Sequence, residues 1–268
     1  MQLPTDGGPE FNSFKSNVKQ LAVKADDQNI SPNTLTVALD QVAAVLPTLR
    51  GRVAQTNAQP RLAEALYAHW QAAQPAAGRH YWSARSWGML IWQPAYLAVL
   101  AVHQAQCALS LTGLQQSVSA GVTSGFTLPN QQLQCGGTDA LIAYTANSLR
   151  IYHQQHYPQL NAVQPYAERL AACLTVDCVL SALLLANQIQ RWPEQRLVQL
   201  AERWLTALQW TRHGALMQIE LPAGRRVPAL LRQGCCQHFR LQGEAPCSNC
   251  PRRPLDERIE IMRSEMVI

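Results

Sequence analysis

The stretch "AERLAACLTVDCVLSALLLANQ", residues 167–188, decides the fold, because its side chains are almost continuously apolar. A helix that is apolar on all sides is normally buried, so this stretch predicts a central helix packed on several faces. Asp177 lies in the middle of the run. A carboxylate is rarely buried alone, so we expect Asp177 to be paired or to cap a backbone group.

Further helices are predicted on either side of this central one. Residues 61–70 place apolar side chains at helical spacing, and residues 193–208 repeat the pattern after Pro193, which suits a first helical position. The most apolar stretch, "WGMLIWQPAYLAVLAVHQAQ" (87–106), is interrupted by Gln93 and Pro94. We interpret it as a buried core helix that Pro94 breaks or begins, and not as a membrane span.

Two segments depart from the helical pattern. Residues 109–129 are rich in Ser, Thr and Gly and alternate around Val118, which predicts a β-hairpin or short sheet. A further strand is expected at 215–221 and a last helix in the tail after Pro254. The predicted fold class is therefore mainly α-helical (α+β), with a helical domain over 1–213, its hairpin insertion near 109–129, and a C-terminal segment over 214–268.

The C-terminal segment holds the clearest functional motif. In "GCCQHFRLQGEAPCSNCPRR" (234–253), Cys235 and Cys236 are adjacent, and Cys247 and Cys250 follow as Cys-x-x-Cys. Residues 212–253 also carry seven arginines against two acidic residues, whereas all three lysines lie in the first 24 residues. The thiols therefore lie in the most basic part of a chain whose net charge is +5. Such a patch attracts anionic ligands or acidic partners.

Four clustered thiols are compatible with an iron–sulfur cluster, a zinc site or a redox dithiol. The N-terminal "MQLPTDGGPEFNSF" lacks the pattern of a secretory signal, so we expect a reducing compartment, which disfavours a disulfide framework. Adjacent side chains such as those of Cys235 and Cys236 tend to diverge, which makes one tetrahedral ion awkward and a two-iron cluster easier. The remaining cysteines, Cys107, Cys135, Cys173 and Cys178, are expected to be ordinary buried residues.

The pattern Cys-Cys-x10-Cys-x-x-Cys resembles that of the ferric siderophore reductase family typified by FhuF. The similarity covers about residues 225–253 and includes "RQGCCQHFRL" and "CSNCP". This resemblance implies that Cys235, Cys236, Cys247 and Cys250 bind a [2Fe-2S] cluster, so that 214–268 is an iron–sulfur segment and 1–213 a substrate-binding domain. It also implies an oxidoreductase of iron acquisition that reduces a ferric siderophore, of hydroxamate or carboxylate type, by one-electron transfer to release Fe(II).

No Gly-rich nucleotide motif is seen, so the electrons are expected from a separate carrier of ferredoxin or flavodoxin type. We expect a cytoplasmic protein without a transmembrane segment. Peripheral contact with the inner face of the membrane is compatible with this expectation. Docking of substrate or donor is predicted for the basic and aromatic residues near the motif and in "HYWSARSW": Arg225, Arg226, Arg232, His238, Arg240, Arg252, Arg253, Trp82 and Trp87. His238 could also couple reduction to proton uptake.

Three alternatives stay open at this point. A zinc-stabilised binding module could use its arginines for nucleic acid, although no helix-turn-helix or zinc-finger spacing is present and we expect no nucleic-acid partner. An iron–sulfur protein could instead bind a siderophore without turnover. A dithiol oxidoreductase is the weakest alternative, because Cys247 lacks a strand-and-helix setting of the thioredoxin kind.

Overall fold

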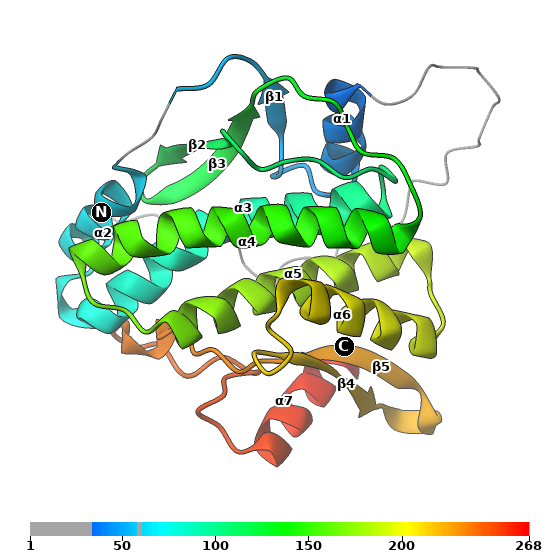
Figure 1. Cartoon of the computed structure of the whole chain (residues 1–268). Helices are drawn as coiled ribbons and strands as arrows, with labels where there is room; N and C mark the ends of the chain where they lie inside the picture. Colours follow the sequence, from blue (N-terminus) through cyan, green and yellow to red (C-terminus); the bar gives the residue numbers. More distant parts are fainter. Residues whose placement is uncertain (1–33, 58–60, 268) are drawn as a thin grey trace. The chain divides into compact units, whose positions relative to one another are not determined.

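A computed structural model describes residues 34–57 and 61–267 of the chain (Figure 1). The described residues belong to one compact unit. The three lysines and the N-terminal stretch tested for a signal lie outside them. The helices are α1 (Leu35–Val45), α2 (Leu62–Ala73), α3 (Arg79–His103), α4 (Thr138–Val163), α5 (Glu168–Gln190), α6 (Glu194–Leu208) and α7 (Leu255–Val267). The strands are β1 (Gly51–Val53), β2 (Gln115–Ser119), β3 (Val122–Leu128), β4 (Ala215–Glu220) and β5 (Arg226–Leu231).

Helices α3 and α5 form the centre of the protein and pack against each other. Helix α4 covers α3 and contacts α6, and α2 packs on both α3 and α4. Most residues of α3 and α5 are buried, which confirms the expectation of core helices in these two apolar stretches. Helix α5 is also the one helix of the described residues that is long and apolar enough to cross a membrane, and 72% of its most apolar window is buried within the protein.

Pro94 neither breaks nor begins α3, so that prediction was wrong. The proline ring removes the hydrogen bond that would reach the carbonyl of Leu90. The hydroxyl of Tyr152, from α4, lies 3.3 Å from that carbonyl oxygen and supplies a replacement partner. One residue earlier, the carbonyl oxygen of Met89 accepts hydrogen bonds from Gln116 Nε2 at 3.2 Å and Thr123 Oγ1 at 3.0 Å. Neighbouring elements therefore satisfy the backbone around the proline, and the helix continues.

The predicted hairpin in the middle of the chain is present as β2 and β3. The two strands are antiparallel and turn at Ala120 and Gly121, both of which have positive φ. Strand β1 joins β3 in parallel, with Gly51 opposite Phe126, and completes a three-stranded sheet that the sequence did not predict. The sheet contacts α3 through β3.

The C-terminal segment consists of the β4–β5 hairpin, a loop that carries the four cysteines, and α7. The hairpin contacts α5 through β5 and α6 through β4, while α7 packs on β4 (Figure 1). Ile219, Leu221, Ala229 and Met262 form a small buried cluster between α7 and the hairpin. Strand β4 and helix α7 were expected, whereas β5 was not. The proposed domain boundary at residue 213 remains a prediction.

Candidate metal centre

The first cysteine pair follows β5 and lies against the central helix α5. The chain meets α5 at Gly234, where an added Cβ would lie 3.0 Å from Cys173 Cβ and 3.1 Å from Leu174 Cδ2. These distances are shorter than ordinary van der Waals contacts, so glycine allows the backbone to approach the helix closely. Cys235 and Cys236 are therefore held next to α5.

The second pair lies on a turn that α7 holds in place. The amide of Cys250 donates to the carbonyl of Cys247 at 3.0 Å, which closes the turn. Arg258 of α7 is only 6% exposed and donates to Asn249 Oδ1, at 2.6 Å from Nη2 and 3.1 Å from Nε. Its Nη2 also donates to the carbonyl of Arg232 at 3.1 Å. A buried arginine thus joins the two cysteine-bearing segments, a role that the sequence did not reveal.

The structure brings the four cysteines together as two pairs of thiols. Cys235 Sγ lies 3.8 Å from Cys250 Sγ. Cys236 and Cys247 form the second pair, because each of these thiols shifts the pKa of the other. Within the residues that the structure describes, no three His, Cys, Asp or Glu side chains form a group that could hold one metal ion. Two pairs of thiolates are the donor set of a two-iron cluster, in which each iron takes two protein ligands.

Cys236 is the thiol that the surroundings stabilise most strongly as a thiolate. The hydrogen bond from Cys247, the charge of Arg232 and the backbone of His238 together lower the pKa of Cys236 to about 4, although burial opposes them. Burial raises the pKa of Cys235 to about 11. Cysteine binds a metal ion as the deprotonated thiolate. The positive charge of Arg232 therefore favours the metal-binding form of Cys236.

Arg232 is the cation closest to the thiols. Its Nε donates to Asp177 Oδ2 at 2.9 Å, and its Nη1 lies 3.9 Å from Cys247 Sγ. Asp177 lies on α5 and is almost fully buried, and burial raises the pKa of its carboxyl to about 6 even though Arg232 opposes the shift. The expectation that Asp177 is paired is confirmed, and its partner is one of the predicted site residues.

Three further side chains from the helical part of the chain influence the surroundings of Cys236. Tyr81, Arg85 and Tyr166 each interact electrostatically with that thiol. Arg85 also lies over the ring of Trp70, 4.8 Å from its centroid. Among the described residues, Arg85 Nε and the Tyr166 hydroxyl are buried without a hydrogen-bond partner. Sequence reasoning missed Tyr81 and Tyr166, because they lie far along the chain from the cysteines and in no recognisable motif.

A basic and aromatic group lies on the outer side of the same loop. The guanidinium carbon of Arg252 lies 4.6 Å from the centroid of Phe239, and that of Arg240 lies 5.6 Å from it. Both arginines are exposed. His238 Nε2 lies 3.4 Å from Glu244 Oε2 in the same loop. We call Arg240, Phe239 and Arg252 the outer arginine group.

The remaining predicted docking arginines lie elsewhere. Arg225 and Arg226 are at the start of β5, the opposite end of the strand from Arg232, and Arg226 forms an ion pair with Glu194 at 3.1 Å. Arg253 donates from Nη2 to the carbonyl of Pro246 at 2.7 Å and from Nε to that of Cys247 at 3.2 Å. Arg253 therefore orders the cysteine loop, while Arg225 and Arg226 are separated from it.

The two predicted tryptophans differ in position. Trp82 is half-buried, and both Trp82 and Leu241 of the cysteine loop pack against the cluster of Trp70, Ala77 and Tyr81. Trp87 is 0% exposed and donates from Nε1 to the carbonyl of Ala171 at 2.9 Å. This position corrects the expectation that Trp87 lines a docking surface, because its helix is covered on that side by α5.

The cysteines outside the motif follow the sequence-based expectation in three of four cases. Cys107, Cys173 and Cys178 are buried, whereas Cys135 is exposed in the segment between β3 and α4. The expectation that Cys135 is buried was therefore wrong.

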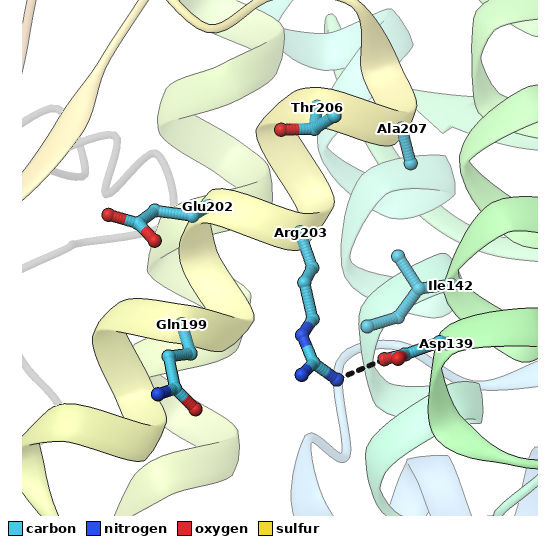
Figure 2. Close-up of a pocket in the computed structure, with 7 residues that line it drawn as sticks. All are labelled: Asp139, Ile142, Gln199, Glu202, Arg203, Thr206 and Ala207. Carbon is cyan, nitrogen blue, oxygen red and sulfur yellow. Dashed lines mark hydrogen bonds and ion pairs between the residues drawn. The ribbon is translucent and has the colours of Figure 1, made fainter.

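Surface grooves in the described residues lie away from the thiols. One of about 420 Å³ lies between α4 and α6 and contains the ion pair of Arg203 with Asp139 (Figure 2). Another of about 570 Å³ is lined by Glu194, Val198 and Arg226. Neither includes a residue of the cysteine loop. These grooves do not place a substrate next to the four thiols.

Four thiols in two pairs, beside a buried cation, define a site of the iron–sulfur class. A comparison with protein-family models agrees, because residues 232–252 match the FhuF 2Fe-2S C-terminal domain. The matched residues include all four cysteines and begin at Arg232. The chain thus carries a FhuF-type C-terminal domain, and the cofactor of that domain is a [2Fe-2S] cluster.

Proposed function

We propose that the protein is a ferric siderophore reductase that uses its [2Fe-2S] cluster to release iron as Fe(II). The observation that carries this proposal is the match of residues 232–252 to the FhuF 2Fe-2S C-terminal domain, together with the paired thiols found there. A separate ferredoxin or flavodoxin type carrier supplies the electron. We further propose that the reaction takes place in the cytoplasm, at or near the inner face of the membrane.

The chemistry of the substrate explains why electron transfer alone suffices. Hydroxamate and carboxylate siderophores present hard oxygen donors, which bind Fe(III) far more tightly than Fe(II). One electron added to the ferric ion therefore turns a trapped ion into an exchangeable one, and no covalent bond of the siderophore breaks. The cluster, when bound, supplies that electron.

The protein's own residues hold the site and attract the reactants. Asp177 and Arg258 fix Arg232 beside the thiols from two different helices. The exposed outer arginine group lies within the same loop as Cys236 and Cys247. Its positive charge favours the approach of an acidic electron carrier or an anionic ferric complex. We assign this surface to the carrier, because it presents two exposed cations around one aromatic ring.

The zinc-module alternative is not favoured. Over the described residues, no group of three or more side chains could hold one metal ion, whereas a structural zinc site needs four ligands around one point. Two of the arginines that it would use for nucleic acid are paired with Glu194 and Glu257. A siderophore-binding protein without turnover differs from the proposed enzyme only in its kinetics, and the experiment below separates the two.

The test is electron transfer from the reduced protein to ferric siderophores under anaerobic conditions. Protein reduced by dithionite and freed of it is mixed with ferric complexes of hydroxamate or carboxylate type, with a ferrous chelator present. We expect re-oxidation of the cluster absorbance and trapping of one Fe(II) per electron. Cys135→Ser, a change at an exposed cysteine outside the motif, should retain this reaction, whereas Cys235→Ala, which leaves no ligand atom, should lose it together with the visible spectrum. Binding of the complexes without re-oxidation would overturn the reductase proposal.

A further inference from the structure

Two irons with four cysteine ligands can be arranged in three ways. The cysteines could pair within each motif, Cys235 with Cys236 and Cys247 with Cys250. They could instead pair between motifs, either Cys235 with Cys247 and Cys236 with Cys250, or Cys235 with Cys250 and Cys236 with Cys247. The family match identifies the cluster but does not distinguish these arrangements.

The sulfur–sulfur distances favour one of them. A metal–thiolate bond of about 2.3 Å in tetrahedral geometry places two sulfurs of one metal about 3.8 Å apart. Cys235 Sγ and Cys250 Sγ are 3.8 Å apart, although they come from different motifs. Thiolates on opposite irons point away from each other across the cluster and would not lie at this distance.

The other two thiols form the second pair. Cys236 and Cys247 are the two thiols that remain, and Arg232 is a neighbour of both, with its Nη1 3.9 Å from Cys247 Sγ. Neighbouring side chains on an extended backbone diverge, which explains why Cys235 and Cys236 belong to different pairs. The cysteine loop then brings each thiol of the first motif to one thiol of the second.

We propose that Cys235 and Cys250 bind one iron and that Cys236 and Cys247 bind the other. The two irons are inequivalent in this arrangement, because Arg232 lies 3.9 Å from Cys247 Sγ and also interacts electrostatically with Cys236. The positive charge of Arg232 thus belongs to the Cys236–Cys247 pair. The inference rests on the [2Fe-2S] cofactor and not on the reductase activity.

Double serine variants of the full-length protein, loaded with ⁵⁷Fe, test the pairing by Mössbauer spectroscopy of the oxidised state. Serine supplies an oxygen ligand, which changes the isomer shift and quadrupole splitting of the iron that it binds. In Cys235→Ser/Cys250→Ser we expect one quadrupole doublet with wild-type parameters and one strongly changed. In Cys235→Ser/Cys236→Ser we expect both doublets to change. The Cys135→Ser variant, at an exposed cysteine outside the motif, serves as control and should leave both unchanged.

Either other result overturns the assignment. An unchanged doublet in Cys235→Ser/Cys236→Ser would show pairing within each motif. Two changed doublets in both double variants would show the pairing of Cys235 with Cys247.

A measurement on the wild-type protein covers the case in which the double variants do not assemble a cluster. In the reduced state one iron is ferric and the other ferrous, and the β-protons of their cysteines shift in opposite directions on warming. We expect ¹H NMR with selectively labelled cysteine to show Cys235 and Cys250 with one temperature dependence, and Cys236 and Cys247 with the other. Cys235 and Cys236 sharing one dependence, or all four cysteines behaving alike, would contradict the proposal. A cluster that shows the expected pairing and reduces no siderophore would refute only the proposed function.

Discussion

Arg232 and Asp177 form an ion pair between the cysteine segment and the central helix, with Arg232 Nε 2.9 Å from Asp177 Oδ2. The side chain of Asp177 is 6% exposed and that of Arg232 is 20% exposed. The same guanidinium reaches Cys247 Sγ through Nη1. The metal centre is therefore tied electrostatically to α5, and changes at either residue should affect both stability and redox behaviour.

Replacing Arg232 by Gln should lower the reduction potential of the cluster. Reduction adds one negative charge to the site, and a nearby cation stabilises that charge. We expect the equilibrium constant for reduction to fall at least about tenfold, which corresponds to about 59 mV for one electron. Potentiometric titration followed by visible absorption measures the shift. Arg226→Gln removes an equal charge at the far end of β5 and should leave the potential nearly unchanged; equal shifts in both variants would contradict a local role of Arg232.

Replacing Asp177 by Asn should destabilise the folded protein. The substitution preserves the shape of the side chain but leaves the charge of Arg232 without its carboxylate, and breaking a buried pair in this way typically costs about 3–5 kcal/mol. Urea unfolding monitored by circular dichroism gives the change in free energy. Asp139→Asn removes the carboxylate of an exposed pair with Arg203, and we expect it to cost no more than about 1 kcal/mol. Similar costs for the two variants would show that the Arg232–Asp177 pair adds nothing beyond a surface contact.

The helical framework could be predicted from sequence because apolar periodicity is a local signal. The apolar run around Asp177 was sufficient to predict α5, and the cysteine motif was sufficient to predict the 2Fe-2S domain that residues 232–252 match. The continuity of α3 through Pro94 could not be predicted, because the partners that satisfy its backbone, Tyr152 and Gln116, come from a different helix and strand. Local sequence carries no information about such long-range compensation.

The surroundings of the cluster were predicted only in part, for the same reason. Arg232 was identified from its place near the motif, but its partner Asp177 lies 55 residues earlier. Arg85 and Tyr81 reach the site from the first turns of α3, and their role depends on how the cysteine loop packs over that helix. Arg225 and Trp87 were included as a basic residue near the motif and an aromatic residue in "HYWSARSW". Arg225 precedes β5, at the opposite end of that strand from Arg232, and Trp87 is fully buried in the core.

Charge reversal in the outer arginine group should slow reduction of the protein by an acidic carrier. In Arg240→Glu/Arg252→Glu, two exposed cations beside Phe239 become anions, which removes electrostatic steering. We expect the second-order rate of reduction by a ferredoxin or flavodoxin to fall at least about tenfold at low salt, with the difference shrinking as salt rises. Stopped-flow absorbance follows the rate. Arg225→Glu/Arg226→Glu, which changes the net charge by the same amount far from the thiols, is the matched control. An equal loss in the control would indicate a net-charge effect instead of a docking surface.

Two buried histidines should make the fold sensitive to acid. Burial lowers the pKa of His103 to about 4, with the charge of Arg196 adding to the shift, and burial lowers that of His153 to about 4 as well. His103 Nε2 accepts a hydrogen bond from Trp204 Nε1 at 2.9 Å, which requires an unprotonated nitrogen. An unfolded histidine takes up a proton near pH 6.5, so between about pH 6.5 and 4 the unfolded chain binds more protons than the folded one. Stability is therefore lost as the pH falls through this range.

Within that window, each of the two histidines should lower the free energy of unfolding by up to about 1.4 kcal/mol for each unit by which the pH falls. His103→Gln keeps an acceptor for Trp204 and removes the titrating ring, so we expect it to remove about half of the combined contribution. Urea unfolding at pH 7, 5.5 and 4.5, compared between wild type and variant, measures the difference in slope. His80→Gln, at an exposed position, should reproduce the wild-type slope. If the free energy of unfolding of His103→Gln depends on pH as strongly as that of wild type, His103 does not take up a proton on unfolding. The hydrogen bond to Trp204 would then not depend on pH in this range.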